Sequence, residues 1–202
     1  MNTPTPPLKI TDLELFKRVL TASCYDESAW QIVDDPRPPL TNKFKPKQKL
    51  QERWFAKALS LLKQQGHEVV RTEAFDMERR QSGNDWPLFG YTMVGHKRLD
   101  NIHECIKTVL EDNIPGDIIE TGVWRGGAMM FAKAALNYYG VTDRKIWCAD
   151  SFQGLPKQYD RDIEIGVDPE LSGMRILAVS QEEVANNFKR FDLLDDDIEF
   201  LV

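Results

Sequence analysis

Two acidic residues of this chain, Glu120 and Asp150, each end a short apolar run, and each precedes a turn that contains glycine. Glycine at a strand-to-helix turn lets the backbone approach a ligand closely. A carboxylate at the end of the strand can bind a cationic or hydroxyl-bearing group. Because adjacent parallel strands present their carboxyl ends at one edge of an open α/β sheet, we expect both carboxylates in one ligand site.

The turn after Glu120 suits the cofactor S-adenosylmethionine, whose sulfonium and amino groups are cationic. Asp150 follows this turn by roughly the 20 to 30 residues at which an acidic side chain grips a ribose diol in nucleotide-binding folds. Taken alone, Asp150 has an equally good interpretation as a turn- or helix-capping aspartate. Its combination with the glycine turn favours ligand binding.

Two other cofactor classes fit the glycine turn less well. A nicotinamide-binding turn has the pattern G-x-G-x-x-G, and the bulky Trp124 stands where its second glycine belongs. A P-loop continues with Lys-Ser or Lys-Thr after its glycines, whereas Ala128 follows Gly127 here. The spacing therefore disfavours a nicotinamide oxidoreductase and a nucleotide triphosphatase.

The elements that must position these residues alternate as in an α/β fold. Apolar runs predict three strands, over 117–120, 145–150 and 198–202. Helical periodicity predicts helices over 98–111, 126–139 and 181–191. Earlier in the chain we expect a helix capped by Thr11 or Asp12, a second over 48–65 and a third that begins within 71–80.

Three sequence blocks, 90–95, 120–127 and 150–156, resemble the macrocin O-methyltransferase family, and 13–21 resembles its first helix. The resemblance covers nearly the whole chain. It implies a Rossmann-like class I methyltransferase sheet (98–202) after an N-terminal helical extension and lid segment (1–97). Members of this family methylate sugar hydroxyls on macrolides and related natural products. The resemblance thus implies an S-adenosylmethionine-dependent O-methyltransferase with a small hydroxylated acceptor.

The resemblance also implies which residues contact the cofactor. They are Thr92, Met93, Glu120, Thr121, Gly122, Val123, Trp124, Asp150, Ser151, Phe152, Gln153, Gly154 and Ser180. Ser180 has a second interpretation, because with Glu183 it forms the capping box of a helix. Trp124 and Phe152 are either cofactor-stacking groups or core aromatics.

The catalytic groups are not identified by the sequence. Some relatives use a histidine in the loop after the second strand as general base, but 157–180 contains none. His103 falls on a predicted helix and is expected to be a surface or core residue. Relatives use Mg²⁺ held by aspartates on strands that would follow Val202, so no metal ligand is assigned. The run Asp195–Asp197 is interpreted as a turn.

Only the first three strands of the family sheet are expected in these 202 residues. We therefore expect a truncated or split gene product that retains the adenosine-binding half, with the strand over 117–120 at an open apolar edge. Such a chain should bind the cofactor weakly or not at all. The alternative is an inactive cofactor-binding or partner-binding fragment that pairs with a complementary C-terminal chain. A homo-oligomer is a further possibility.

The bulk composition limits which partners and which cellular compartment we expect for this protein. The net charge of −6 argues against nucleic acid as a partner, and the four lysines in 43–49 are expected to be a solvated loop face. No apolar run approaches the ~20 residues of a membrane span. The three cysteines are widely spaced, which excludes a full disulfide framework, and Cys148 lies in an apolar run typical of a buried side chain. We expect a cytoplasmic protein.

Overall fold

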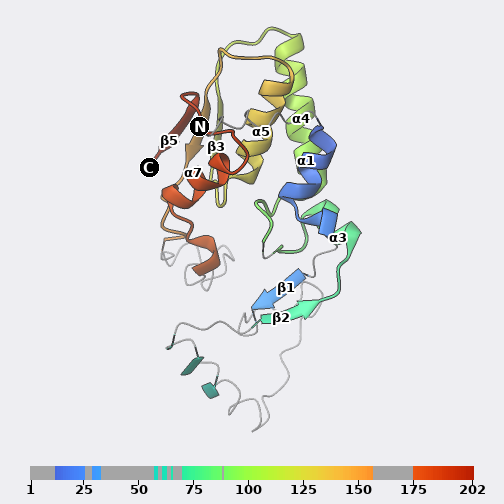
Figure 1. Ribbon diagram of the computed structural model, residues 1–202, viewed down its shortest axis with the longest axis vertical. Coiled ribbons are helices and arrows are strands. Elements are labelled where there is room, and N and C mark those ends of the chain that lie inside the picture. Colours follow the sequence, from blue (N-terminus) through green and yellow to red (C-terminus); the bar gives the residue numbers. More distant parts are fainter. Residues whose placement is uncertain are drawn as a thin grey trace, which may run out of the picture.

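The computed structural model describes residues 12–25, 29–32, 57–58, 61–62, 65, 70–87, 89–156 and 175–202. A parallel three-stranded sheet in the order β3–β4–β5 forms one side of the upper part of the molecule in Figure 1, with the helices beside it. The strands are β3 (Ile118–Thr121), β4 (Ile146–Ala149) and β5 (Ile198–Leu201). The predicted α/β class and all three predicted strands are confirmed.

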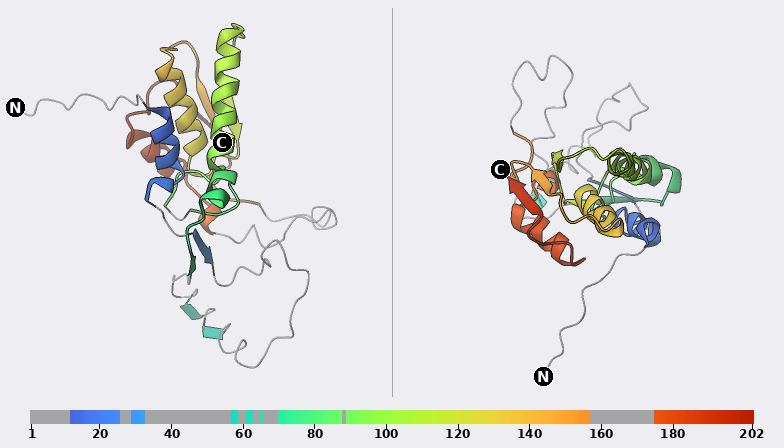
Figure 2. Two further views of the ribbon diagram at one scale, coloured as in Figure 1. Left: turned by 90° about the vertical axis from the view of Figure 1, so that its right-hand side faces the viewer. Right: turned by 90° about the horizontal axis from the view of Figure 1, so that it is seen from above.

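Two helices connect the strands of the sheet. Helix α5 (Gly127–Tyr138) joins β3 to β4, and α7 (Gln181–Lys189) lies between β4 and β5. Seen from above in Figure 2, both lie on the same side of the sheet, as right-handed crossovers between parallel strands require. Helix α4 (Gly95–Glu111) precedes β3 and packs on α5. All three helices are predicted within a few residues of their observed ends.

The register of the strands sorts their side chains onto two faces. Ile118, Ile146 and Ile198 are aligned, and two residues further on Glu120 aligns with Cys148 and Phe200. Ile146 and Cys148 have no exposed surface, so this face is the one that the helices cover. Glu120 is therefore a carboxylate on the covered face of the sheet, next to a buried thiol.

Helix α5 is the centre of the hydrophobic core. Its side chains from Ala128 to Leu136 are all buried, including Phe131 at 0% exposure. Helix α1 (Leu13–Leu20) packs on α5 through Leu13, Phe16 and Leu20, which belong to the same cluster. Asp12 caps α1 as predicted, because its side chain accepts the N–H of Leu15 at 2.9 Å. A short 3-10 turn, η1 (Ser23–Tyr25), follows α1.

The region before α4 differs from the prediction. Residues of β2 (Val70–Glu73) pair antiparallel with β1 (Ala29–Ile32), and neither strand was predicted. The helix α3 begins only at Met77 and ends at Ser82. Asp76 fixes that start, because its carboxylate accepts the N–H groups of Glu78 and Arg79. The predicted helix over 48–65 lies largely outside the described residues.

The acidic run before β5 is a turn, as predicted. Asp195 and Asp197 bind the buried ammonium of Lys133 on α5 at 2.9 and 2.7 Å. Cys148 is also buried as predicted, and all three cysteines are free thiols. No described helix has the length and apolar character that crossing a membrane requires.

Candidate functional site

The two predicted turns meet at the carboxyl ends of β3 and β4. Asp150 Oδ2 accepts the N–H of Val123 at 2.7 Å, and Asp150 Oδ1 accepts the N–H of Phe152 at 2.9 Å. The N–H of Gly122 adds a bond to the carbonyl of Ala149 at 2.9 Å. Asp150 is thus a turn-capping aspartate and also lies at the expected ligand edge, so both interpretations of this residue describe the same geometry.

Glu120 is the electrostatically unusual group of the site. Its Oε2 atom is buried and has no hydrogen-bond partner within the described structure. Burial, and secondly the nearby Asp150 carboxylate, raise the pKa of Glu120 to about 7. Burial and the charge of Glu120 in turn raise the pKa of Cys148 to about 12, so this thiol stays protonated. A buried acceptor without a donor is costly unless a ligand supplies one.

The three glycines of the first turn have different surroundings. Gly122 has φ +89°, and a Cβ built on it would meet no described atom within 4 Å. A Cβ on Gly127 would lie 2.4 Å from the carbonyl oxygen of Tyr91, and one on Gly126 would lie 2.9 Å from Val184. Gly122 therefore borders open space, whereas the other two let protein segments pack closely against the turn.

Trp124 and Arg125 fasten the first turn to its surroundings. Trp124 has φ +49°, and its indole N–H donates to the carbonyl of Ile176 at 2.7 Å. The Arg125 guanidinium lies 4.5 Å above the Trp124 ring and donates to the carbonyl of Gly90 at 3.0 Å. Asn187 of α7 donates to the Arg125 carbonyl at 3.0 Å. These contacts come from three separate segments and hold the turn in place.

The second turn, from Asp150 to Gly154, is also held by its own contacts. The Ser151 hydroxyl donates to the Gly154 carbonyl at 3.1 Å and accepts the N–H of Gln153 at 3.3 Å. Phe152 has φ +52°, and its ring lies edge-on to Phe200 at 6.0 Å. Phe152 therefore packs partly against the sheet, which agrees with the core interpretation of this aromatic.

The remaining predicted site residues lie on neighbouring segments. Thr92 is buried against the start of α5, where its hydroxyl accepts the N–H of Val94 at 3.2 Å, and Met93 beside it is partly exposed. Ser180 is exposed and caps α7 by accepting the N–H of Glu183 at 3.1 Å. The capping interpretation of Ser180 is thus confirmed, while its cofactor contact stays a prediction.

Sequence reasoning missed three residues that shape the site. Tyr91 accepts the N–H of Gly127 at 3.0 Å, and Arg125 and Asn187 hold the turn as described above. The only signal for Tyr91 was its place in the block 90–95, and a glycine pair at 126–127 indicates close packing without naming its partner.

His103 is a packing residue, as expected. Its Nε2 lies 2.8 Å from the Tyr139 hydroxyl, and its ring lies edge-on to Phe131. Within the described part of the chain, no three His, Cys, Asp or Glu side chains form a cluster that could hold a metal ion. The described residues therefore do not fit a Mg²⁺ site, and we derive no reaction step through one.

The parallel sheet with acidic strand ends and a glycine turn is Rossmann-like. Its similarity to the solved O-methyltransferase structure described below assigns it to the class I methyltransferase fold. A family model described as macrocin-O-methyltransferase (TylF) matches residues 10–202, so this chain belongs to that family. Membership in it implies S-adenosylmethionine as the methyl donor.

Individual relatives agree with this assignment. The mycinamicin III 3''-O-methyltransferase of Micromonospora griseorubida is 45% identical over 136 residues, which are 66% of this chain and 54% of that protein. The 8-demethyl-8-(2,3-dimethoxy-alpha-L-rhamnosyl)-tetracenomycin-C 4'-O-methyltransferase of Streptomyces olivaceus is 47% identical over 132 residues, 62% of this chain and 49% of that protein. The solved structure of the O-methyltransferase NovP matches with a TM-score of 0.67 at 33% identity, covering 93% of this chain and 61% of that structure. The chain spans about half the length of the curated relatives it matches.

Proposed function

We propose that this chain binds S-adenosylmethionine at the carboxyl ends of β3 and β4. The observation that carries the proposal is the buried Oε2 atom of Glu120, which has no donor within the described structure and lies on the same strand end as the open space above Gly122. A cationic amine would supply that donor. When bound, the cofactor supplies an electrophilic methyl group.

The two turns would hold different parts of the cofactor. In our proposal Glu120 to Trp124 hold the methionine part, and Asp150 to Gly154 hold ribose and adenine. Each Asp150 oxygen accepts one backbone N–H and has a further lone pair for a ribose hydroxyl. Thr92, Met93 and Ser180 complete the site. Because the protein already fixes both turns, binding would need little ordering of the backbone.

The reaction that this site would serve is methyl transfer to a hydroxyl of a sugar or natural-product acceptor. The names of the relatives support this, since one describes transfer to oxygen on a rhamnosyl-bearing tetracenomycin. The contribution of these residues is to hold the donor in one orientation and to exclude water around it. We further propose that the complete enzyme uses Mg²⁺, and we assign none of the described residues a role in holding it. We also propose that the chain has two parts, an N-terminal helical extension and lid segment (1–97) and a Rossmann-like part (98–202).

Calorimetric titration with S-adenosylhomocysteine and S-adenosylmethionine tests the cofactor proposal. We expect saturable binding, which Glu120→Gln weakens by about tenfold or more, because a hydrogen bond to a charged group contributes ~1.5–3 kcal/mol. Glu104→Gln, at an exposed position of α4, is the matched control and should leave the affinity unchanged. No binding at about 1 mM ligand, where even a weak site is occupied, would contradict the proposal.

A second candidate function rests on the exposed edge of the sheet. Strand β3 has no neighbour on its outer side among the described residues, and Ile119 is 57% exposed. An apolar edge strand favours pairing with another chain. The chain would then bind the cofactor and pair along this edge with a partner segment that supplies the neighbouring strand. Methyl transfer that occurs only after mixing with the separately expressed C-terminal half of a relative would favour this candidate. Turnover by the chain alone would exclude it.

A further inference from the structure

A buried ion pair lies outside the proposed cofactor site, between α3 and the segment that follows it. Arg80 Nε donates to Asp85 Oδ2 at 2.7 Å, and both side chains are only 1% exposed. Arg80 Nη1 also donates to the carbonyl of Thr21 at 2.8 Å. The desolvation of two buried charges offsets much of the free energy of their attraction. A buried ion pair is therefore weak evidence of a stabilising role. A role in fixing local geometry explains it better.

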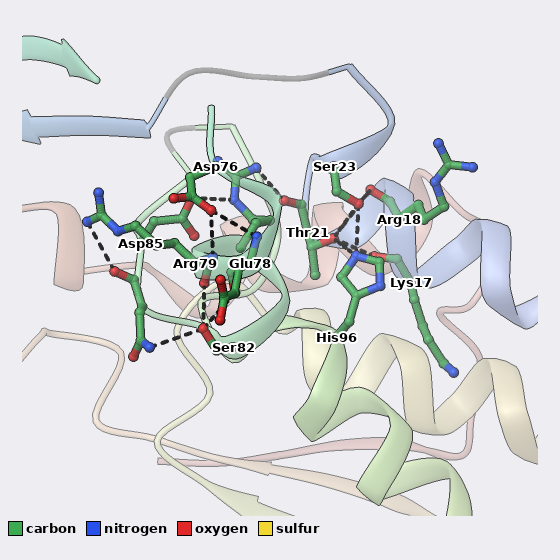
Figure 3. Close-up of polar contacts among 12 residues, drawn as sticks. Lys17, Arg18, Thr21, Ser23, Asp76, Glu78, Arg79, Ser82, Asp85 and His96 are labelled. Atoms are coloured by element: carbon green, nitrogen blue, oxygen red, sulfur yellow. Dashed lines mark hydrogen bonds and ion pairs between the residues drawn. The ribbon is translucent and has the colours of Figure 1, made fainter. Parts of the chain in front are cut away.

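Thr21, which Arg80 contacts, is itself firmly held. Its hydroxyl lies 2.9 Å from His96 Nε2 and 3.1 Å from the hydroxyl of Ser23, and both contacts are drawn in Figure 3. His96 belongs to α4, so the end of α1 is connected to that helix. Arg80 therefore binds a carbonyl whose position is set by two other elements, which makes Thr21 a fixed reference point.

Asp85 is the first residue of a segment that passes the end of α1. We call the described residues of this segment, 85–87 and 89–92, the strap. The preceding carbonyl, that of Leu20, accepts the N–H groups of Tyr91 at 2.7 Å and Thr92 at 3.3 Å. Gly90 packs against Pro87, because a Cβ on Gly90 would lie 2.7 Å from the Pro87 ring. The strap is thus held at both ends by adjacent carbonyls, those of Leu20 at the end of α1 and of its C-cap residue Thr21. Thr21 acts through Arg80, and Leu20 binds the backbone of the strap directly.

The far end of the strap touches the first cofactor turn. The Tyr91 carbonyl accepts the N–H of Gly127, and the Gly90 carbonyl accepts the Arg125 guanidinium, each at 3.0 Å. Gly127 begins α5 directly after the turn, and its lack of a Cβ is what permits this approach. A continuous series of hydrogen bonds therefore leads from the ion pair, through Thr21, Leu20 and Tyr91, to the turn.

We propose that Arg80 and Asp85 are a positioning pair, which holds the strap so that Gly90 and Tyr91 fix the first cofactor turn in its binding geometry. The proposal rests on the proposed cofactor function. Neither residue would touch the cofactor. The pair acts through the strap, and its loss should loosen the contact at Gly127 before it unfolds the sheet.

The decisive variant is the double substitution Arg80→Met with Asp85→Leu. Removing both charges together leaves no uncompensated buried ion, so the fold is expected to persist. We expect the Kd for S-adenosylhomocysteine to rise about tenfold, within the range of coupling through packed networks. Hydrogen exchange of the Gly127 amide should accelerate by about the same factor relative to the Ile146 amide in β4. Arg80→Lys keeps the charge and should change the Kd and the Gly127 exchange rate less than the double variant does. If the double variant does not fold, Arg80→Lys provides the test.

The control is Lys133→Met with Asp197→Leu, which removes an ion pair between a buried ammonium on α5 and a one-third-exposed carboxylate before β5, away from the strap. Asp195, the second partner of Lys133, is half exposed, so its charge stays hydrated in this variant. It should leave both the Kd and the relative exchange of Gly127 unchanged. Unchanged Gly127 exchange in the Arg80 and Asp85 variants would overturn the positioning role, as would a Kd no different from that of the control. Absence of cofactor binding by the unmodified chain would instead contradict the proposed function, and the exchange measurement would still decide whether the pair positions the turn.

Discussion

Asp150 and Val123 join the ends of two neighbouring strands through one hydrogen bond, 2.7 Å from the Val123 N–H to Asp150 Oδ2. The other oxygen of the same carboxylate caps its own turn at Phe152. Asp150 therefore holds both turns of the site in place, and in our proposal it also contacts the ribose of the cofactor. A substitution at Asp150 should affect both the geometry of the first turn and the direct contact with ribose.

The substitution Asp150→Asn should weaken cofactor binding by at least tenfold. Asparagine offers one acceptor oxygen in place of two, so one of the two backbone N–H groups loses its partner, at a cost of ~1–3 kcal/mol. Calorimetry and thermal unfolding measure the two effects. Asp143→Asn, at an exposed aspartate in the loop before β4, should change neither. Equal affinity in Asp150→Asn and the unmodified chain would show that Asp150 has no part in binding.

The affinity for S-adenosylmethionine should depend on pH through Glu120, whose pKa is raised to about 7. Only the ionised carboxylate pairs with a cationic amine. The affinity should therefore fall about tenfold for each pH unit below about 7 and level off above it. Titrations between about pH 5.5 and 7.5 check this, with Glu120→Gln expected to show no such slope. The same slope in Glu120→Gln would assign it to another group.

The same raised pKa has an opposite consequence for stability. A carboxyl group whose pKa is higher in the folded protein favours folding at low pH, and this contribution is lost as the pH rises from 4.5 to about 7. The shift corresponds to at most about 3 to 4 kcal/mol. Glu120→Gln, which cannot ionise, should therefore raise the Tm at pH 8 by several degrees while it weakens cofactor binding. An equal or lower Tm at pH 8 would contradict the buried, unpaired state of Glu120.

Gly122 and Gly127 should respond differently to alanine. At Gly127 the new Cβ meets the Tyr91 backbone at 2.4 Å, so Gly127→Ala should cost up to ~3 kcal/mol of stability. At Gly122 the Cβ meets no described atom, so Gly122→Ala should cost only the ~1–2 kcal/mol of a left-handed backbone and should chiefly weaken cofactor binding.

Gly140→Ala is the control for this pair of glycines. Gly140 has φ +72° and equally open surroundings, but it follows α5 at the opposite end of that helix from the first turn. It should show the backbone cost of Gly122→Ala in thermal unfolding without the loss of affinity. If Gly122→Ala and Gly140→Ala bind the cofactor equally well, the space above Gly122 is not part of the binding site.

The sequence predicted what local patterns determine. The apolar runs and glycines predict the strand ends at Glu120 and Asp150 and the helix between them. Each of these elements is indicated by residues close to it in the sequence. The different surroundings of Gly122 and Gly127 were not predictable, since they depend on Tyr91, which is distant in the sequence. The strand Val70–Glu73 was missed because its charged residues resemble a helix surface and its partner lies about 40 residues earlier.

His96 should make the stability of the fold sensitive to mild acid. Burial lowers the pKa of His96, although the Glu14 and Asp100 carboxylates oppose this, so the folded protein holds the ring neutral. As the pH falls below the ordinary value of 6.5, the unfolded chain binds a proton that the folded chain resists. The free energy of unfolding should therefore decrease from about pH 6.5 down to the lowered pKa and then stay level. Thermal unfolding of the unmodified chain and of His96→Gln between about pH 7.5 and 5 isolates the contribution of His96 to the free energy of unfolding, because the carboxylates titrate alike in the two proteins. Parallel Tm curves for the two proteins would mean that His96 ionises equally in the folded and unfolded chains.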